Sequence, residues 1–214
     1  MGYSEKQLGI NLNNKINPST VHEAGDRLGT YYLTDNPKYF EIQRSNNFVF
    51  YVSGLTEQFK ADKTIENNIY ARDNADDVFK LSVKESSVPH FTQSVIEVKR
   101  GNNTMKFAGA PSFDNGQVVL DDFIGAGTKE VLLAWQRKSY DVQTEKVGLA
   151  SDYKKDAYLL EYTPDYQLVR TWKLVGCWIS GLSEDSYSHD NNDKRAITAT
   201  ITYDKAFIDT SDVE

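Results

Sequence analysis

Residues 166–185, which read YQLVRTWKLVGCWISGLSED, restrict the fold more than any other segment. Successive side chains of a β-strand point to opposite faces of a sheet. Strict alternation puts Leu168, Trp172, Leu174 and Trp178 on one face and Val169, Val175, Cys177 and Ile179 on the other. Neither set suits a solvent-facing surface. This strand is therefore predicted to be buried on both faces, either within one domain or against a partner chain.

The composition permits one globular domain and disfavours several kinds of protein. A chain of 214 residues can bury its own core, and the single cysteine, Cys177, excludes an internal disulfide and a cysteine-built metal site. We therefore expect a reducing compartment. The start lacks a signal-peptide core and no stretch approaches the roughly 18 apolar residues of a membrane span, so no membrane partner is expected. The net charge of −7 disfavours a nucleic-acid-binding surface.

Alternating apolar residues predict several further strands. They are expected at 47–55, 76–91, 117–124, 156–163 and 195–204, and residues 93–111 are typical of a hairpin that turns at 100–103. Within 76–91, alternation places Phe79, Leu81 and Val83 on the buried side. Pro89 then ends this strand or marks a sheet edge.

One segment, residues 128–141, has a convincing helical pattern. Thr128 can cap its start, and Val131, Leu132 and Trp135 share one stripe that should pack on a sheet. By contrast, residues 1–45 are expected to form an irregular arm, with a short strand near 31–33, and 56–77 a long polar loop. The predicted fold class is mainly β, a sandwich or barrel with one α-helix at about 128–139 beside the sheet.

No group of residues predicts enzyme chemistry, so we expect no catalytic residues, no cofactor and no metal site. GAGTK at 125–129 lacks the residue order of a phosphate-binding loop and is explained as a turn with a helix cap. The acidic stretches 73–77 and 188–194 lack calcium-loop spacing. Ser183, Asp185 and His189 include the residue types of a catalytic triad but lie in one short polar loop.

Six segments, in this order, resemble the tail tube proteins of contractile bacteriophages, whose relatives include the inner-tube proteins of type VI secretion and other contractile injection systems. The resemblance covers about residues 46–209. Its segments are NFVFYVSGL, FKLSVKESSVPHF, the hairpin with the strand after it, a helix ending in LLAWQ, YKKDAYLLEY, and a terminal pair of strands from Trp172 to Asp204. The terminal pair contains Gly-x-Trp at Gly176 and Trp178 and closes on Tyr203.

The resemblance implies a structural subunit of a phage tail tube. Six subunits would form a ring, rings would stack, and strands of neighbours would join into a barrel around a lumen. Sheath, baseplate and tape-measure proteins would be partners, and DNA would pass through the lumen without specific binding. The implied location is the virion tail, after synthesis in the host cytoplasm. The domain would span 46–209, between the 1–45 arm and a 210–214 tail.

The same resemblance assigns residues to two sets. The first is a family motif of structural residues: Pro89, Phe91, Trp135, Gln136, Tyr153, Lys154, Gly176, Trp178 and Tyr203. The second is a face of the doubly apolar strand expected to contact a neighbouring subunit: Val169, Val175, Cys177 and Ile179. An acidic lumen would repel the phosphate backbone, which would give the net charge a function.

Two other functions remain open at this point. A tube initiator, terminator or baseplate ring would have the same fold and form one ring only. A β-sandwich module for carbohydrate binding or adhesion would also explain the aromatic residues and acidic loops, and it predicts a monomer with exposed loop aromatics.

Overall fold

The computed structural model describes residues 42–62, 65–190 and 192–209. The chain divides after Arg44, and the second unit, Ser45–Glu214, contains every helix and strand of the described residues. The predicted arm at 1–45, apart from its last residues, with its short strand near 31–33, and the tail at 210–214 lie outside the described residues.

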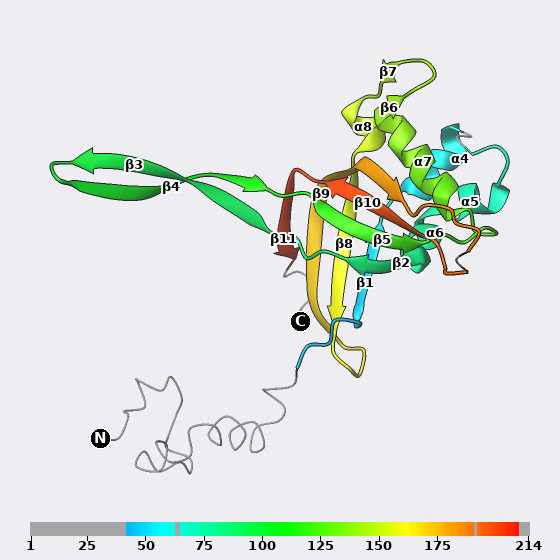
Figure 1. Ribbon diagram of the computed structural model, residues 1–214, viewed down its shortest axis with the longest axis horizontal. Helices are drawn as coiled ribbons and strands as arrows, with labels where there is room; N and C mark the ends of the chain where they lie inside the picture. The colour runs from blue at the N-terminus through cyan, green and yellow to red at the C-terminus, as the bar shows by residue number, and fades with distance from the viewer. Residues whose placement is uncertain (1–41, 63–64, 191, 210–214) are drawn as a thin grey trace, which may run out of the picture. The chain divides into compact units, whose positions relative to one another are not determined.

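Strands predominate along the described chain (Figure 1). The strands are β1 (Phe48–Val52), β2 (Val83–Ser86), β3 (Phe91–Arg100), β4 (Asn103–Phe113), β5 (Gly116–Asp121), β6 (Tyr140–Asp141), β7 (Lys146–Val147), β8 (Lys155–Tyr162), β9 (Leu168–Glu184), β10 (Ala196–Thr202) and β11 (Lys205–Asp209). The helices are α4 (Leu55–Asp62), α5 (Ile69–Asp73), α6 (Ala75–Ser82), α7 (Thr128–Ser139) and α8 (Ala150–Tyr153).

Seven strands form one antiparallel sheet with the order β1-β8-β9-β10-β5-β2, and β11 also pairs with β9. The long strand β9 belongs to both halves of this sheet. Its first part pairs with β8 and β11, and its last part pairs with β10. We call β1, β8, β11 and the first part of β9 the lower half; it is the group of strands that runs down the centre of Figure 1.

Gly176 allows β9 to pass from one half to the other. Lys155 and Ala157 of β8 lie opposite Cys177 and Leu174, so β9 contains one extra residue between them, which is a β-bulge. Gly176 has a φ of 71°, and a Cβ atom added there would lie 2.3 Å from Oδ2 of Asp204. Both the backbone conformation and the close approach of Asp204 therefore require glycine.

The bulge changes which residues of β9 face the core. Leu174, Cys177 and Ile179 are all buried in one core, whereas Val175 and Trp178 are half-buried. The predicted alternation, which put Leu174 with Trp178 and Val175 with Cys177, is therefore wrong beyond Gly176. An inserted residue reverses the faces of every residue that follows it.

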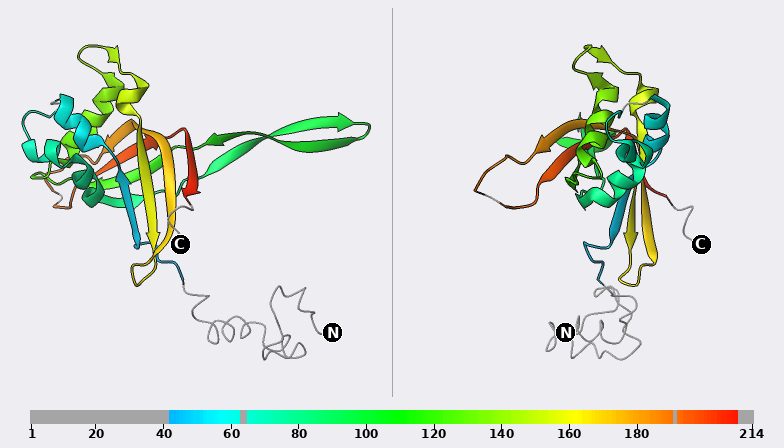
Figure 2. Two further views of the ribbon diagram at one scale, coloured as in Figure 1. Left: turned by 180° about the vertical axis from the view of Figure 1, so that it is seen from behind. Right: turned by 90° about the vertical axis from the view of Figure 1, so that its right-hand side faces the viewer.

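Helices α6 and α7 pack on the core side of the sheet, and α4 and α5 pack against these two helices (Figure 2). Phe79 of α6 is fully buried between Phe50 of β1, at 6.0 Å between ring centroids, and Trp135 of α7, at 5.9 Å. The Trp135 indole N–H donates to the carbonyl of Tyr153, 2.8 Å away. Helix α7 thus has the apolar stripe and the sheet contact predicted for residues 128–139.

The predictions for residues 56–82 are wrong, because this segment is mainly helical rather than loop and strand. Asn68 caps α5 by accepting the N–H of Ala71 at 3.0 Å. The first backbone N–H groups of α4 and α6 each bond to a side chain of the other helix. Oδ1 of Asp76 accepts the N–H of Leu55 at 2.8 Å, and the N–H of Asp76 donates to Oγ1 of Thr56 at 2.9 Å. These side-chain bonds satisfy backbone groups that a helix start leaves without partners.

The remaining elements agree with the sequence patterns. Strands β1, β5, β8 and β10 and the β3–β4 hairpin lie where alternation predicted them, and the class is mainly β with antiparallel pairing. The described residues form four helices besides the one expected, and their main sheet is an open path from β1 to β2 rather than a closed barrel. Among the described residues, no helix has the length and apolar character needed to cross a membrane.

Candidate assembly surfaces

The β3–β4 hairpin is a two-stranded ribbon that projects from the sheet, with no other described element beside its outer half (Figures 1 and 2). Its register gives it two different faces. Cross-strand pairs Ile96–Phe107 and Val98–Met105 form one face, which we call the apolar ribbon face. Pairs Glu97–Lys106 and Lys99–Thr104 form the opposite, polar face, where Glu97 and Lys106 make an ion pair at 3.5 Å.

The apolar ribbon face is uncovered within the described chain. Ile96 is 53% exposed and Phe107 50% exposed. The base of the ribbon is anchored, because Phe113 contacts Phe91 at 5.6 Å and Tyr203 at 6.1 Å between ring centroids. An isolated two-stranded ribbon is only marginally stable in water, and a row of exposed apolar side chains on it indicates a protein contact.

The charge of the ribbon differs from that of the rest of the chain. Residues 91–113 contain three basic side chains and one acidic side chain, a charge of +2, which leaves −9 on the remainder of a chain with a net charge of −7. The ribbon is therefore a basic segment of an otherwise acidic chain.

The lower half of the sheet ends in two strand edges of equal length. Among the described strands, β1 pairs only with β8, and β11 pairs only with β9. Each of these edge strands has five residues. An edge strand presents backbone N–H and C=O groups to any strand that can reach them.

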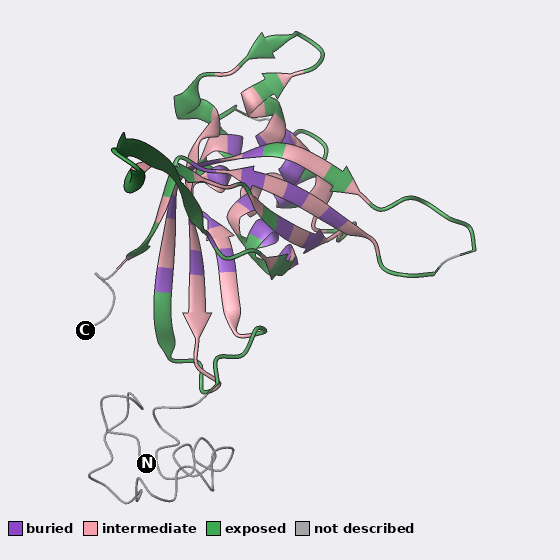
Figure 3. Cartoon of the chain, turned by 60° about the vertical axis from the view of Figure 1, so that its left-hand side comes forward, coloured by how far each residue is buried: buried purple, intermediate pink, exposed green. Residues whose placement is uncertain are grey.

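The face of the lower half that points away from the core is half-exposed or exposed except at Thr171, which is buried (Figure 3). We call it the open face. Its residues, assigned from the register, are Val49, Tyr51, Asp156, Tyr158, Leu160, Thr171, Lys173, Val175, Lys205, Phe207 and Asp209. Its acidic and basic side chains are equal in number, so the open face is close to neutral.

One row crosses the open face from edge to edge. The register aligns Tyr51, Tyr158, Lys173 and Phe207. The rings of Tyr51 and Tyr158 stack with centroids 5.0 Å apart, and Nζ of Lys173 lies 5.6 Å from the Tyr158 centroid. The Tyr158 hydroxyl and the carboxylate of Asp156, which lies 3.4 Å from Nζ, raise the pKa of Lys173.

Five of the predicted motif residues meet where α7, α8 and β9 approach one another. Trp135 bonds the carbonyl of Tyr153, and the Tyr153 ring contacts Trp178 edge-on at 5.6 Å. Nζ of Lys154 donates to the carboxylate of Asp204 at 2.7 Å, which raises the pKa of Lys154. That carboxylate is the group that excludes a side chain at Gly176. The cluster fixes the position of β9 relative to the helices.

Three other motif residues lie at the base of the ribbon. Pro89 and Tyr203 are buried, and Tyr203 contacts Phe113. Burial raises the pKa of the Tyr203 phenol. Phe91 is exposed apart from its contact with Phe113. These residues lie where the ribbon joins the sheet, so their expected structural role stays a prediction.

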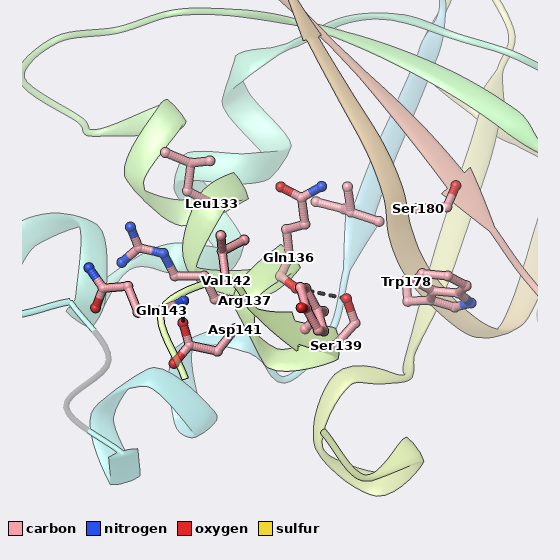
Figure 4. A pocket seen from close by; sticks show the side chains of 11 residues that line it. Leu133, Gln136, Arg137, Ser139, Asp141, Val142, Gln143, Trp178 and Ser180 are labelled. Atoms are coloured by element: carbon pink, nitrogen blue, oxygen red, sulfur yellow. Dashed lines mark hydrogen bonds between the residues drawn. The ribbon is translucent and has the colours of Figure 1, made fainter. Parts of the chain in front are cut away.

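Gln136, the last motif residue, lines a shallow groove of about 430 Å³ between the end of α7 and β9 (Figure 4). Arg137, Asp141 and Trp178 also line it. The Asp141 carboxylate already accepts the N–H of Gln143 at 3.0 Å and the hydroxyl of Thr144 at 2.8 Å, and these bonds lower its pKa. A carboxylate held ionised in this way is poorly suited to act as a general acid.

The predicted inter-subunit set separates into two pairs. Val169 and Val175 have exposed surface, so a contact there remains a prediction. Cys177 and Ile179 are 0% and 1% exposed within the subunit core, so the inter-subunit assignment does not apply to them. The physical reason is the bulge at Gly176.

Burial raises the pKa of Cys177 to about 12 from an ordinary value of 9.0. Between these values the unfolded state binds fewer protons than the folded state, so the free energy of unfolding falls as pH rises. Below pH 9 the buried, protonated thiol of Cys177 makes its full contribution to the free energy of unfolding. We expect the free energy of unfolding, measured in urea above pH 9, to fall with pH about 1 kcal/mol per pH unit more steeply in the native protein than in Cys177→Ala. Equal slopes would contradict this prediction.

The comparisons with known proteins identify the fold. No family model and no curated protein matches the chain. A chain from the sheath-tube complex of PVC, an extracellular contractile injection system, superposes with a TM-score of 0.58 at 17% identity, over 82% of this chain and 97% of that chain. A chain from the tube-terminating cap of the anti-feeding prophage gives 0.56 at 15% identity, over 79% and 92%.

A chain from the baseplate of the anti-feeding prophage also superposes, with a TM-score of 0.54 at 12% identity, over 78% of this chain and 95% of that chain. The fold is therefore that of the tube-type proteins of contractile machines, which confirms the expected resemblance at the level of the fold. These neighbours come from a sheath-tube complex, a tube-terminating cap and a baseplate, so the fold is shared by several positions in such assemblies.

Proposed function

We propose that this protein is a structural subunit of the inner tube of a contractile tail or injection machine, and that it assembles into rings that stack. The observation that carries the proposal is the pair of five-residue edges, β1 and β11, at the two ends of the lower half of the sheet. The neighbours in tube, cap and baseplate assemblies support the same function.

The two edges are suited to pair with each other between copies. Neighbouring strands of the lower half are all antiparallel, so β11 of one copy would continue the alternation by pairing with β1 of the next. Placing Phe207 opposite Tyr51 of the next copy also brings Ile208, which is 45% exposed, opposite Phe50. Such pairing removes both edges and closes a ring of identical subunits.

Closure of this sheet determines which face lines the lumen. The helices and the other half of the sheet lie on the core side of the lower half. The centre of a ring has no room for the helices and the other half of the sheet of every subunit. These parts must therefore lie on the outside of the ring, and the open face on the inside. On this assignment the lumen is close to neutral, and the net charge of −7 lies elsewhere, so the expected acidic lumen gains no support from the open face.

The ribbon supplies a second contact between copies. Its apolar face favours burial against a neighbouring subunit, the basic charge of the ribbon as a whole favours an acidic surface, and the length of the ribbon lets it reach beyond its own sheet. We propose that the ribbon joins subunits, and that the arm at 1–45 and sheath or baseplate proteins make further contacts.

The finer expectations are part of the same proposal: a six-subunit ring, a phage virion as the location, and a lumen through which DNA and a tape-measure protein pass. A terminator, initiator or baseplate ring is the second candidate, because a cap chain and a baseplate chain share the fold.

Negative-stain electron microscopy of the purified full chain across a concentration series tests the proposal. Stacked rings or hollow tubes are expected for a repeating tube subunit. Rings that never stack would favour an end-ring protein. A protein that stays monomeric at every concentration, including after addition of preformed rings, would contradict the proposal and favour a carbohydrate-binding or adhesion module.

A further inference from the structure

We infer that one side of the last part of β9 binds the N-terminal arm of a second copy as an added strand, and that this exchange joins stacked rings. We call this side, along residues 178–184, the free β9 edge. The inference rests on the proposed function and deepens it, because it gives the arm a partner and gives the contact between rings a site.

The register leaves one side of β9 without a strand beyond the bulge. β8 flanks β9 only up to the bulge. β11 and β10 follow each other along the opposite side, since Lys205 lies opposite Val175 and Thr202 lies opposite Trp178. Among the described strands, therefore, none pairs with the β8 side of residues 178–184. The backbone N–H and C=O groups of such an edge are a template for another strand.

The groove beside α7 opens onto the start of the free β9 edge (Figure 4). Trp178 and Ser180 line the groove from β9, and the end of α7 lines its other side. Tyr140 and Val142 also line it and leave apolar surface exposed. A segment that adds to a sheet edge gains main-chain hydrogen bonds from the edge and side-chain contacts from hollows beside it. The groove can supply the second kind of contact.

The free β9 edge and the start of β1 lie at opposite ends of the lower half (Figure 1). The chain enters β1 at Phe48, at the bottom of the view, whereas β9 passes its bulge at the top. In a closed ring the strands of the lower half run, tilted, from one rim to the other. Stacking of rings in the same direction therefore brings the point from which the arm leaves one ring close to the free β9 edges of the next ring.

The arm contains a segment suited to this edge. Residues 30–34 read TYYLT, and β-branched and aromatic residues of this kind are enriched in strands. The segment contains no proline, so each of its residues has an N–H group to donate. Roughly 13 residues separate it from β1, and they can span at most about 45 Å. The arm of a second copy therefore has the composition and the reach that the free β9 edge requires.

Disulfide cross-linking between two variants in assembled tubes tests the inference. Both variants carry Cys177→Ala, which removes the single native cysteine. The first variant has one further substitution in the arm, which is Tyr31→Cys, Tyr32→Cys or Leu33→Cys. The second has Ser183→Cys on the free β9 edge, or Ser112→Cys on β4 as the matched control, and both of these serines are exposed. A size tag on the second variant identifies the mixed product.

After oxidation, we expect the product that joins the arm to position 183 at a yield at least about tenfold above the product that joins it to position 112, because a disulfide forms only between closely spaced residues. Adjacent arm positions should differ in yield, because successive side chains of a strand point to opposite faces.

Proline substitutions in the arm test strand addition without altering the folded sheet. Tyr31→Pro and Tyr32→Pro are each compared with the alanine variant at the same position. Proline has no N–H group, and one of two adjacent residues in an antiparallel edge strand directs its N–H at the neighbouring strand. We expect at least one proline variant to lower the fraction of subunits that sediment as tubes about tenfold relative to its alanine counterpart.

Three results would overturn the inference: equal cross-linking of the arm to positions 183 and 112, equal cross-linking from all three arm positions, or proline variants that stack as well as their alanine counterparts. Tubes that give any of these results leave the proposed function intact and assign the contact between rings to other surfaces. Absence of rings and tubes in the microscope is a separate observation, which would end the proposed function and the arm site together.

Discussion

A subunit with Ile96→Asp and Phe107→Asp is expected to fold normally and to remain monomeric at concentrations at which the native chain forms rings and tubes. The two residues are a cross-strand pair at the centre of the apolar ribbon face, and both are half-exposed in the subunit. The two substitutions therefore lower the stability of the folded subunit only slightly. An assembled interface would have to bury two carboxylates without partners, at a cost of several kcal/mol per subunit contact.

The control for this variant lies on the other face of the same ribbon. Glu97→Ala with Lys106→Ala removes an exposed ion pair one position along and should leave assembly and stability nearly unchanged. Sedimentation velocity across a concentration series measures both variants, and thermal unfolding confirms that both are folded. If the aspartate variant assembled as well as the native chain, the ribbon would not be an assembly surface.

The second large effect concerns α6, where sequence alternation and the structure disagree. Phe79→Ala is expected to lower the free energy of unfolding by about 3–5 kcal/mol, because a fully buried ring between Phe50 and Trp135 is lost. Leu81→Ala should change it by no more than about 0.5 kcal/mol, because Leu81 is 75% exposed. If residues 76–83 formed a strand, Phe79→Ala and Leu81→Ala would lower the free energy of unfolding by similar amounts.

Urea unfolding in the monomeric Ile96→Asp, Phe107→Asp background separates this effect from assembly. A cost for Leu81→Ala close to that for Phe79→Ala would contradict the helix. A small cost for Phe79→Ala would contradict its place in the core.

The residues of α6 show why local patterns were insufficient. Phe79, Leu81 and Val83 alternate as in a strand, yet Ala75, Val78, Phe79 and Ser82 also follow the i, i+3, i+4, i+7 spacing of a helix and are the buried ones. Two periodicities coexist over eight residues. The contacts of Phe79 with β1 and α7, which join residues distant in sequence, select the helix.

Much of the candidate site was also beyond sequence reasoning. The hairpin and its turn follow from residues 93–111, and the regular register from the turn back to Val95 separates Ile96 and Phe107 from Glu97 and Lys106. The signal was present as alternation within VIEVK and MKF. What was missing was the knowledge that none of the other described elements covers the apolar side.

The sequence by itself determined the mainly β class, the strands with alternating apolar residues, the helix at 128–139 and the order of segments typical of tail tube proteins. These properties arise from near neighbours in the chain, whose apolar period acts locally, although Gly127 rather than the predicted Thr128 is the N-cap of the helix. Only the tertiary structure decided which faces are covered. Gly176, with the Asp204 carboxylate against it, moves Cys177 and Ile179 into the core, and the open edges of β1 and β11 exist only once the sheet has formed. Burial and edge exposure are set by contacts between distant residues, and local periodicity contains no record of those contacts.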